Sequence, residues 1–201
     1  MASRLLALSD GVFAIAMTLL VLNLRVPAAV AEEDVGRALR DTLPALGAYA
    51  LSFVVIALFW LGHHRLFQFV ARVDRALILL NLVQLGLVAL IPFPTEVLGG
   101  YGDQRPAAAA YAVVLGLAGA VSALAWVHVL RAGLAHERVP RTELVHGVWR
   151  ATTLAAVFLG SLPLAAVSAT LAEWSWATIA VVFLALARHY GPVRQTFLPE
   201  G

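Results

Sequence analysis

Residues 4–24 read RLLALSDGVFAIAMTLLVLNL, an apolar stretch that is interrupted once, at residues 9–11. A helix needs about 20 mostly apolar residues to cross a bilayer, and Pro27 ends this run. The stretch is longer than the apolar core of a cleavable signal peptide, which is about 7–15 residues. It therefore predicts a first transmembrane helix over residues 5–26.

The composition of the whole chain also indicates a membrane protein. Hydrophobic residues make up 61% of the 201 residues and charged residues 13%, whereas soluble domains are about 45–50% apolar and about 25% charged. The 14 basic residues are all arginine and are spread over several loops, and the net charge is only +2. A nucleic-acid partner is therefore not expected, because such proteins gather their basic residues on one face. Cysteine is absent, which excludes disulfides and thiolate chemistry.

Six stretches are long and apolar enough to be membrane-spanning helices. They cover residues 5–26, 43–61, 76–98, 107–130, 148–171 and 174–187. The polar segment 32–41 is expected to be a short amphipathic helix or a surface loop. The sequence therefore predicts an all-α polytopic membrane protein, with residues 1–201 forming one six-helix transmembrane domain.

The arginines predict the orientation, because cytoplasmic loops carry an excess of basic residues. One side of the predicted membrane holds Arg4, Arg65, Arg72, Arg75, Arg131, Arg138, Arg141, Arg150, Arg188 and Arg194. The other side holds Arg25, Arg37, Arg40 and Arg105. Both termini are therefore expected on the cytoplasmic side, in agreement with an even number of spans.

Asp10 is the most informative residue of the first helix. It lies about two turns inside the span, where an ionisable group costs several kcal/mol unless it is paired or hydrated. Ile15, Leu19 and Leu22 form one stripe at helical spacing with Thr18 beside it, about 140° around the helix from Asp10. The carboxylate and the stripe should therefore face different neighbours, although ordinary helix packing also produces such a stripe.

Four motifs together resemble the endosomal and lysosomal transmembrane potassium channels, and more closely their bacterial six-helix homologues. The first-helix signature of that family is Arg-x-x-x-Phe-Ser-Asp, and this chain has Arg4-x-x-x-Leu8-Ser9-Asp10. The similarity continues in Phe59-Trp60-x-x-His63-His64-Arg65-x-Phe67, in Asn81-Leu82, and in Ile91-Pro92-Phe93-Pro94-Thr95. The motifs lie in the first half of the chain, and the second half matches by hydropathy alone.

The resemblance implies a potassium-selective channel, without a carbonyl-lined pore loop, in the plasma membrane of a bacterium. The first helices would surround the path of the permeant K⁺ in a homo-oligomer, expected to be a tetramer. Ile15 would form the aliphatic constriction, Leu19 and Leu22 further apolar layers, and Thr18 a hydroxyl near the ion. A polar network behind the pore is implied for Arg4, Ser9, Asp10, Trp60, His63, His64 and Asn81. Leu8 in place of Phe removes a ring from the packing of that network.

Two other functions remain open. A proton-linked transporter or proton-permeable pathway would use Asp10 with His63 and His64 as a relay. A non-conducting scaffold protein would carry no ions at all. No cofactor is expected, and no nucleophile motif, phosphate-binding loop or carboxylate pair indicates an enzyme.

Three further features have simpler explanations. Adjacent histidines on a helix point about 100° apart, so His63 and His64 do not predict a metal site. The segment 99–103, Gly-Gly-Tyr-Gly-Asp, resembles part of a potassium filter, but turn chemistry explains it and no room remains for a pore helix. Trp149, Trp174 and Trp176 lie near predicted helix ends and fit an aromatic belt.

Overall fold

The computed structural model describes residues 2–24 and 34–176, and within them it contains helices and no strand. Five segments are long and apolar enough to cross a membrane. They are α1 (Ala2–Leu19) continued by η1 (Leu20–Asn23), α3 (Leu43–Phe69), α4 (Arg75–Leu90) with α5 (Pro92–Tyr101), α6 (Arg105–Ala132), and α7 (Arg141–Gly160) with α8 (Leu162–Val167). The short α2 (Val35–Asp41) lies within the polar segment in which a surface helix was one expectation.

The observed helices differ from the predicted spans mainly at their ends. α3 continues to Phe69 instead of ending at residue 61, and α7 begins at Arg141 instead of residue 148. Both extensions are polar, so hydropathy alone underestimates them. The sixth predicted span, residues 174–187, lies outside the described residues beyond Trp176.

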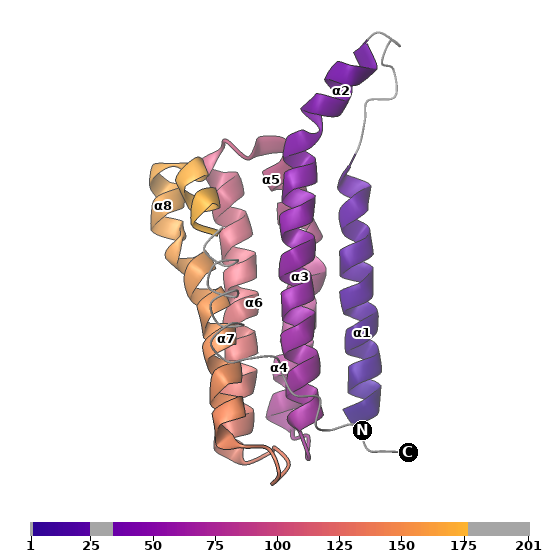
Figure 1. The fold of residues 1–201 in the computed structure, drawn as a ribbon, viewed down its shortest axis with the longest axis vertical. Helices are drawn as coiled ribbons and strands as arrows, with labels where there is room; N and C mark the ends of the chain where they lie inside the picture. Colours follow the sequence, from indigo (N-terminus) through magenta and orange to yellow (C-terminus); the bar gives the residue numbers. More distant parts are fainter. Residues whose placement is uncertain (1, 25–33, 177–201) are drawn as a thin grey trace.

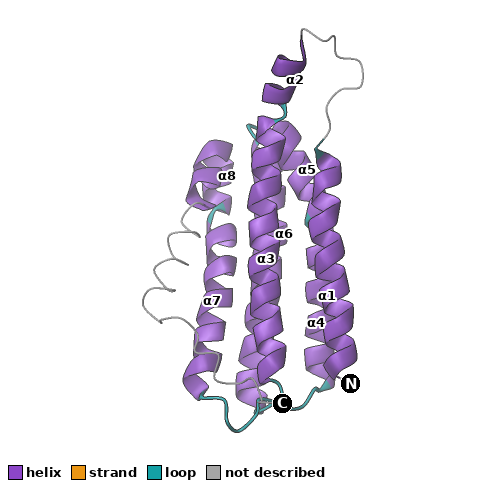
Figure 2. Ribbon diagram, turned by 45° about the vertical axis from the view of Figure 1, so that its right-hand side comes forward, coloured by secondary structure: helices purple, strands orange, loops and turns teal. Residues whose placement is uncertain are grey.

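The long helices run alternately up and down and lie side by side in Figures 1 and 2. α1 begins at the same end of the bundle at which α3 and α6 end and α4 and α7 begin. We call this the arginine-rich end, because it carries Arg65, Arg72, Arg75, Arg131, Arg138 and Arg141. α2 projects beyond the opposite end.

Proline breaks two of the spans near the opposite end. Pro92 begins α5 directly after Ile91, and Pro163 lies in the first turn of α8 after Ser161. Proline lacks a backbone N–H and fits the first turn of a helix but not its interior. The chain therefore restarts a helix at each break instead of crossing the membrane as one straight rod.

The α6–α7 pair has the most extensive contact of the described helices. A Cβ at Gly119 would lie 2.7 Å from the backbone nitrogen of Ala155, and one at Gly147 would collide with the ring of Trp126. Small residues let membrane helices approach closely, because packing rather than hydrophobicity holds them together. The second half of the chain thus contributes a tight helical hairpin against which the others pack.

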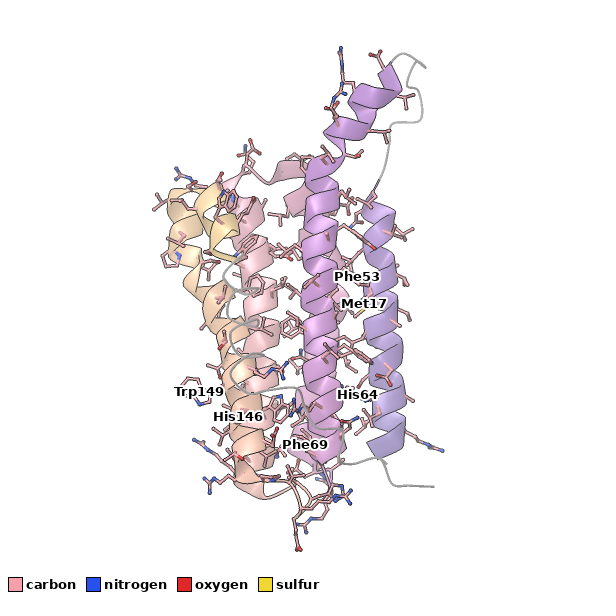
Figure 3. All side chains as sticks on the ribbon, viewed as in Figure 1. Met17, Phe53, His64, Phe69, His146 and Trp149 are labelled. Atoms are coloured by element: carbon pink, nitrogen blue, oxygen red, sulfur yellow. The ribbon has the colours of Figure 1, made fainter. Side chains whose placement is uncertain are left out.

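Several polar side chains inside the bundle are paired with one another. Ser52 forms hydrogen bonds with the hydroxyls of Thr95 (2.8 Å) and Tyr111 (2.9 Å), and all three residues are buried. Trp176 donates to the hydroxyl of Ser161 at 2.9 Å and is 1% exposed. The aromatic-belt interpretation is therefore wrong for Trp176, which is part of the core, whereas Trp149 is exposed on the outer side of α7 (Figure 3).

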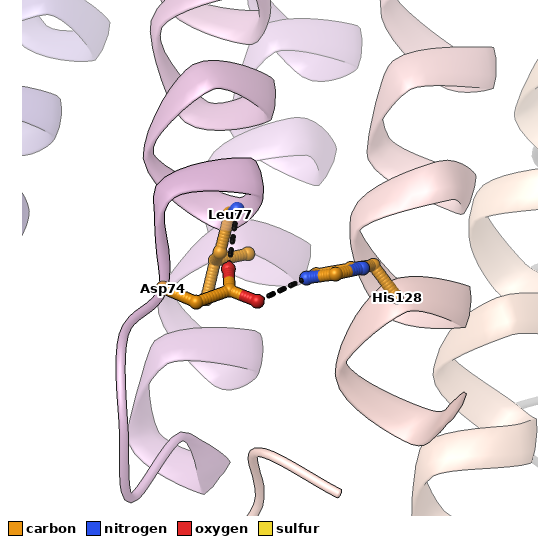
Figure 4. Close-up of polar contacts among 3 residues, drawn as sticks. All are labelled: Asp74, Leu77 and His128. Atoms are coloured by element: carbon orange, nitrogen blue, oxygen red, sulfur yellow. Dashed lines mark hydrogen bonds and ion pairs between the residues drawn. The ribbon is translucent and has the colours of Figure 1, made fainter. Parts of the chain in front are cut away.

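Two loops are tied together at the arginine-rich end. The backbone of Val70 pairs with that of Ala135, and Ala71 N–H donates to Leu134 O at 2.8 Å. Beside this pairing, His128 lies 2.8 Å from Asp74, whose other carboxylate oxygen accepts from Leu77 N–H at 2.8 Å (Figure 4). The Leu77 amide and His128 hold the pKa of Asp74 below its ordinary value. Asp74 therefore caps α4 and joins it to α6.

The glycine-rich segment 99–103 begins within the last turn of α5, which is helical up to Tyr101, and the turn begins only at Gly102. A carbonyl-lined filter requires an extended loop whose oxygens point at the ion. A helix uses those oxygens within its own backbone. The described structure therefore does not show a filter loop in this segment, and the turn begins at Gly102, the third glycine of the motif.

Candidate functional site

The first helix has two different faces. Phe13, Ala16 and Leu20 are at most 1% exposed and pack into the bundle. The other face carries Ile15, Leu19 and Leu22, whose exposed fractions are 58%, 41% and 59%, together with the exposed Thr18. We call these four residues the open face of α1 and η1. A membrane helix can turn such a face only to lipid, to another subunit or to a pathway.

The hydroxyl of Thr18 bonds within its own helix. Its Oγ1 donates to the carbonyl oxygen of Ile15 at 2.9 Å. The lone pairs of the oxygen remain, so the group can still accept a hydrogen bond or approach a cation. The open face is thus aliphatic except for one oxygen.

α1 is fixed to α3 through Asp10, whose side chain is exposed. Trp60 Nε1 donates to Asp10 Oδ1 at 2.9 Å, and the Trp60 ring stacks on His64 with centroids 5.4 Å apart. Figure 3 shows His64 on the side of α3 that faces α1. His64 also lies 2.9 Å from Gln68 one turn later. A charge-assisted bond from an indole thus gives the single acidic residue of α1 a partner.

A second contact fixes α1 to α4. Ser9 donates to the carbonyl oxygen of Leu5 at 2.8 Å and accepts from Asn81 Nδ2 at 3.3 Å. Asn81 Oδ1 lies 2.7 Å from His63 Nε2. Ser9, His63 and Asn81 are all buried, and the ring of His63 packs between Phe13 and Phe67. One line of hydrogen bonds therefore joins three spans.

The structure does not bring Arg4 into this group. Its side chain is exposed, and it forms neither a hydrogen bond nor an ion pair with another residue of the described ranges. The remaining six residues of the predicted network fall into two sets, Asp10 with Trp60 and His64, and Ser9 with Asn81 and His63. Arg65, which follows the histidine pair, instead forms a 2.6 Å ion pair with Glu143 of α7.

A cavity of about 330 Å³ lies behind the far end of η1. Its lining includes Asn23, Tyr49, Thr95, Glu96 and Tyr101. Asn23 Nδ2 donates to the carbonyl oxygen of Pro92 at 3.0 Å, which ties the end of the first span to the break between α4 and α5. Hydroxyls and a carboxylate make this a place for water rather than for lipid tails.

The sequence did not single out several residues that the structure places at or near the network. Gln84 and Ser122 line a small cavity beside His63 and Asn81. Gln84 lies three residues after Asn81 on α4, a spacing that places both on one face of the helix and could have indicated it. Ser122 lies among apolar and small residues of α6 and has no comparable signal. Among residues 2–24 and 34–176, no cluster of three or more potential metal-ligating side chains occurs.

Five antiparallel apolar helices, with paired polar groups between them, define the chain as an all-α multi-pass membrane protein. The model of the family described as endosomal/lysosomal potassium channel TMEM175 matches residues 4–92. A potassium channel of Streptomyces collinus is 44% identical over 144 residues, which are 70% of this chain and 69% of that protein. The chain belongs to the TMEM175 family, a family of ion channels and not of enzymes.

Solved structures and animal relatives extend the comparison. The crystal structure of a lysosomal potassium-selective channel TMEM175 homolog from Chamaesiphon minutus superposes with a TM-score of 0.80. It is 32% identical, and the match covers 92% of this chain and 97% of that one. The human endosomal/lysosomal proton channel TMEM175 is 38% identical over 109 residues, which are 50% of this chain but 22% of that protein.

Proposed function

We propose that this chain is one subunit of a potassium-selective channel whose path is lined by the open face of α1 and η1. The observation that carries the proposal is the contrast between the two faces of this span. Its back is held by Asp10–Trp60 and Ser9–Asn81, whereas Ile15 and Leu22 are more than half exposed. Only 22% of this span is buried, against 28–39% for the other four.

The proposed assembly is a homotetramer with the four first spans around one axis. Closed symmetry places identical open faces against a common centre. A ring of Ile15 side chains would be the constriction, with Thr18, Leu19 and Leu22 in further layers. Such a ring can close a path to ions by excluding water from it.

The selectivity of such a path follows from the cost of removing water. K⁺ is larger and more weakly hydrated than Na⁺, so an aliphatic constriction favours K⁺. The Thr18 oxygen offers a ligand next to that constriction. We therefore expect K⁺ to pass the constriction more readily than Na⁺.

The proposed topology places the arginine-rich end and both termini on the cytoplasmic side of a bacterial plasma membrane. In this arrangement residues 1–201 form one six-helix domain, with the sixth span over residues 174–187. Labelling of single introduced cysteines in intact cells tests the orientation. A cysteine at residue 138 should be protected from an impermeant maleimide, and one at residue 103 should react.

The functional experiment is ion flux from the purified full-length protein in liposomes that contain potassium. Efflux of K⁺ into a non-permeant cation, with much weaker flux when Na⁺ replaces K⁺ inside, is expected. Protease protection verifies insertion first. Correctly inserted protein without any cation flux would contradict the proposal and favour the scaffold function.

A second candidate is a proton pathway that uses Asp10 with His63 and His64. Two observations favour it: the human relative is named a proton channel, and hydrogen-bonded polar side chains lie behind the open face. Proton uptake driven by a pH gradient in potassium-free liposomes tests it. Loss of that uptake in Asp10→Asn, with K⁺ flux retained in wild type and variant, would assign the two ions to separate routes.

A further inference from the structure

A small cavity lies between α3, α4 and α6, on the side of the polar network away from α1. It is lined by His63, Leu66, Leu77, Asn81, Gln84 and Ser122, among others. The space in it that is open to the centre of a water molecule is about 10 Å³. This is close to the room that one water molecule needs.

Two buried acceptor atoms among these lining residues have no partner. His63 Nε2 lies 2.7 Å from Asn81 Oδ1, and Asn81 Nδ2 points to Ser9, so Nε2 carries the proton and donates. Nδ1 of His63 is then an acceptor, and it is buried without a hydrogen bond in the described structure. Oε1 of Gln84 is also a buried acceptor without a hydrogen bond in the described structure, and Gln84 is only 5% exposed.

The two unpaired acceptors, His63 Nδ1 and Gln84 Oε1, determine which kind of group can bind in this cavity. Leaving a buried acceptor unpaired is costly, so natural proteins rarely keep two in one place. Both missing partners are donors, and turning the Gln84 amide would leave its nitrogen unsatisfied instead. Ser122 adds a hydroxyl that forms no hydrogen bond within the described ranges. None of the residues lining this cavity is acidic, so nothing there would compensate the charge of a cation.

We propose that a single buried water molecule occupies this cavity. It donates one hydrogen to His63 Nδ1 and the other to Gln84 Oε1, and it accepts from the Ser122 hydroxyl. Buried waters in proteins make about three hydrogen bonds, and this site offers three. The chain of hydrogen bonds that begins at Ser9 on α1 then continues through Asn81, His63 and the water to α6.

The water gives Gln84 and Ser122 a positioning role. It keeps His63 in the tautomer whose Nε2–H holds Asn81, and Asn81 holds Ser9. The tight α6–α7 hairpin is thereby connected to the buried side of the first span. This inference goes beyond the proposed channel and does not depend on it, because the water is required whichever ion the protein carries.

The test compares the full-length wild type with Gln84→Met, Ser122→Ala and the double variant, purified in the same detergent. Met has nearly the volume of Gln but no polar atom. Gln104→Met is the matched control, because Gln104 is exposed. If water is bound, Gln84→Met lowers the midpoint of thermal unfolding by about 2–4 °C, and Gln104→Met leaves it unchanged. The double variant should lose less than the sum of the single variants, because both residues act through one water.

A dry cavity predicts the opposite sign. Gln84→Met would then remove an unsatisfied acceptor and raise or preserve the midpoint, and the effects of the two substitutions would add. Either result would overturn the proposal. An experimental structure that resolves ordered waters decides directly: a peak about 2.7–3.2 Å from His63 Nδ1 and Gln84 Oε1 is expected, and an empty cavity would refute it.

Discussion

Trp60 on α3 donates a 2.9 Å hydrogen bond to Asp10 on α1, so the one acidic side chain of the first helix is held by a neutral indole rather than by a basic residue. The bond fixes the rotation of α1 about its own axis. Because the open face lies on the same rigid helix, the orientation of Ile15 depends on a contact between other side chains.

Trp60→Phe should weaken this attachment while retaining most of the ring. Hydrogen bonds between membrane helices contribute on the order of 1 kcal/mol, and a loss of that size is expected in thermal or denaturant unfolding. Trp149→Phe is the matched control, since Trp149 is 65% exposed. In a cycle with Asp10→Asn, purely additive losses would show that the two side chains do not interact.

Gly119→Ala should destabilise the protein, because the new Cβ would lie 2.7 Å from the backbone of Ala155 and push α6 from α7. Overpacking of this kind costs about 1–3 kcal/mol. Gly86→Ala has open space around it and should be neutral or stabilising, since alanine favours a helix by about 1 kcal/mol. Unfolding midpoints of the two variants measure the difference, and equal shifts would contradict this account of the hairpin.

Ile15→Asn should change ion transport more than stability. A polar ring at the proposed constriction retains water, so total cation flux is expected to rise several-fold while the preference for K⁺ over Na⁺ falls. Leu79→Asn, at a residue of α4 that is 63% exposed, controls for a polar group on the bundle surface. Unchanged flux and preference in Ile15→Asn would remove Ile15 from the proposed pore.

Asp74 predicts an acid-sensitive contribution to stability. Its pKa is lowered in the folded protein by the Leu77 amide and by His128, so its stabilising effect is complete above the ordinary carboxyl pKa of 3.8. It is lost as the pH falls below that value and through the lowered pKa. Unfolding midpoints measured from pH 6 to pH 3 should therefore fall more steeply for the wild type than for Asp74→Asn. Parallel curves would show that Asp74 makes no such contribution.

The sequence predicted the class of fold because long apolar runs leave few alternatives. It also predicted that Asp10 requires a partner, since an unpaired carboxylate inside a span is costly. Trp60, His63 and Asn81 were identified through the family motifs, and the structure places them in contact with one another or with α1. The start of α7 could not be predicted from hydropathy, because its first turns contain Glu143 and His146.

Contacts between distant segments explain what the sequence could not reveal. Trp176 lies near a predicted span end, which is typical of an interfacial residue, but its indole meets Ser161 inside the core. Arg4 belongs to the recognised signature and yet forms no contact with the network in the described structure. Gln84 and Ser122 become meaningful only when α4 and α6 are brought together around one cavity.

The backbone pairing of Val70 with Ala135 has a mechanical consequence. At the arginine-rich end, the α3–α4 and α6–α7 loops share three backbone hydrogen bonds, and Asp74 adds a side-chain contact with His128 of α6. Separating the helices there would break all of them at once. Bending is less costly at the opposite end, where Pro92 and Pro163 already interrupt two spans. The helices are therefore held together by loop-to-loop hydrogen bonds at the arginine-rich end, and the two breaks in the spans lie near the opposite end.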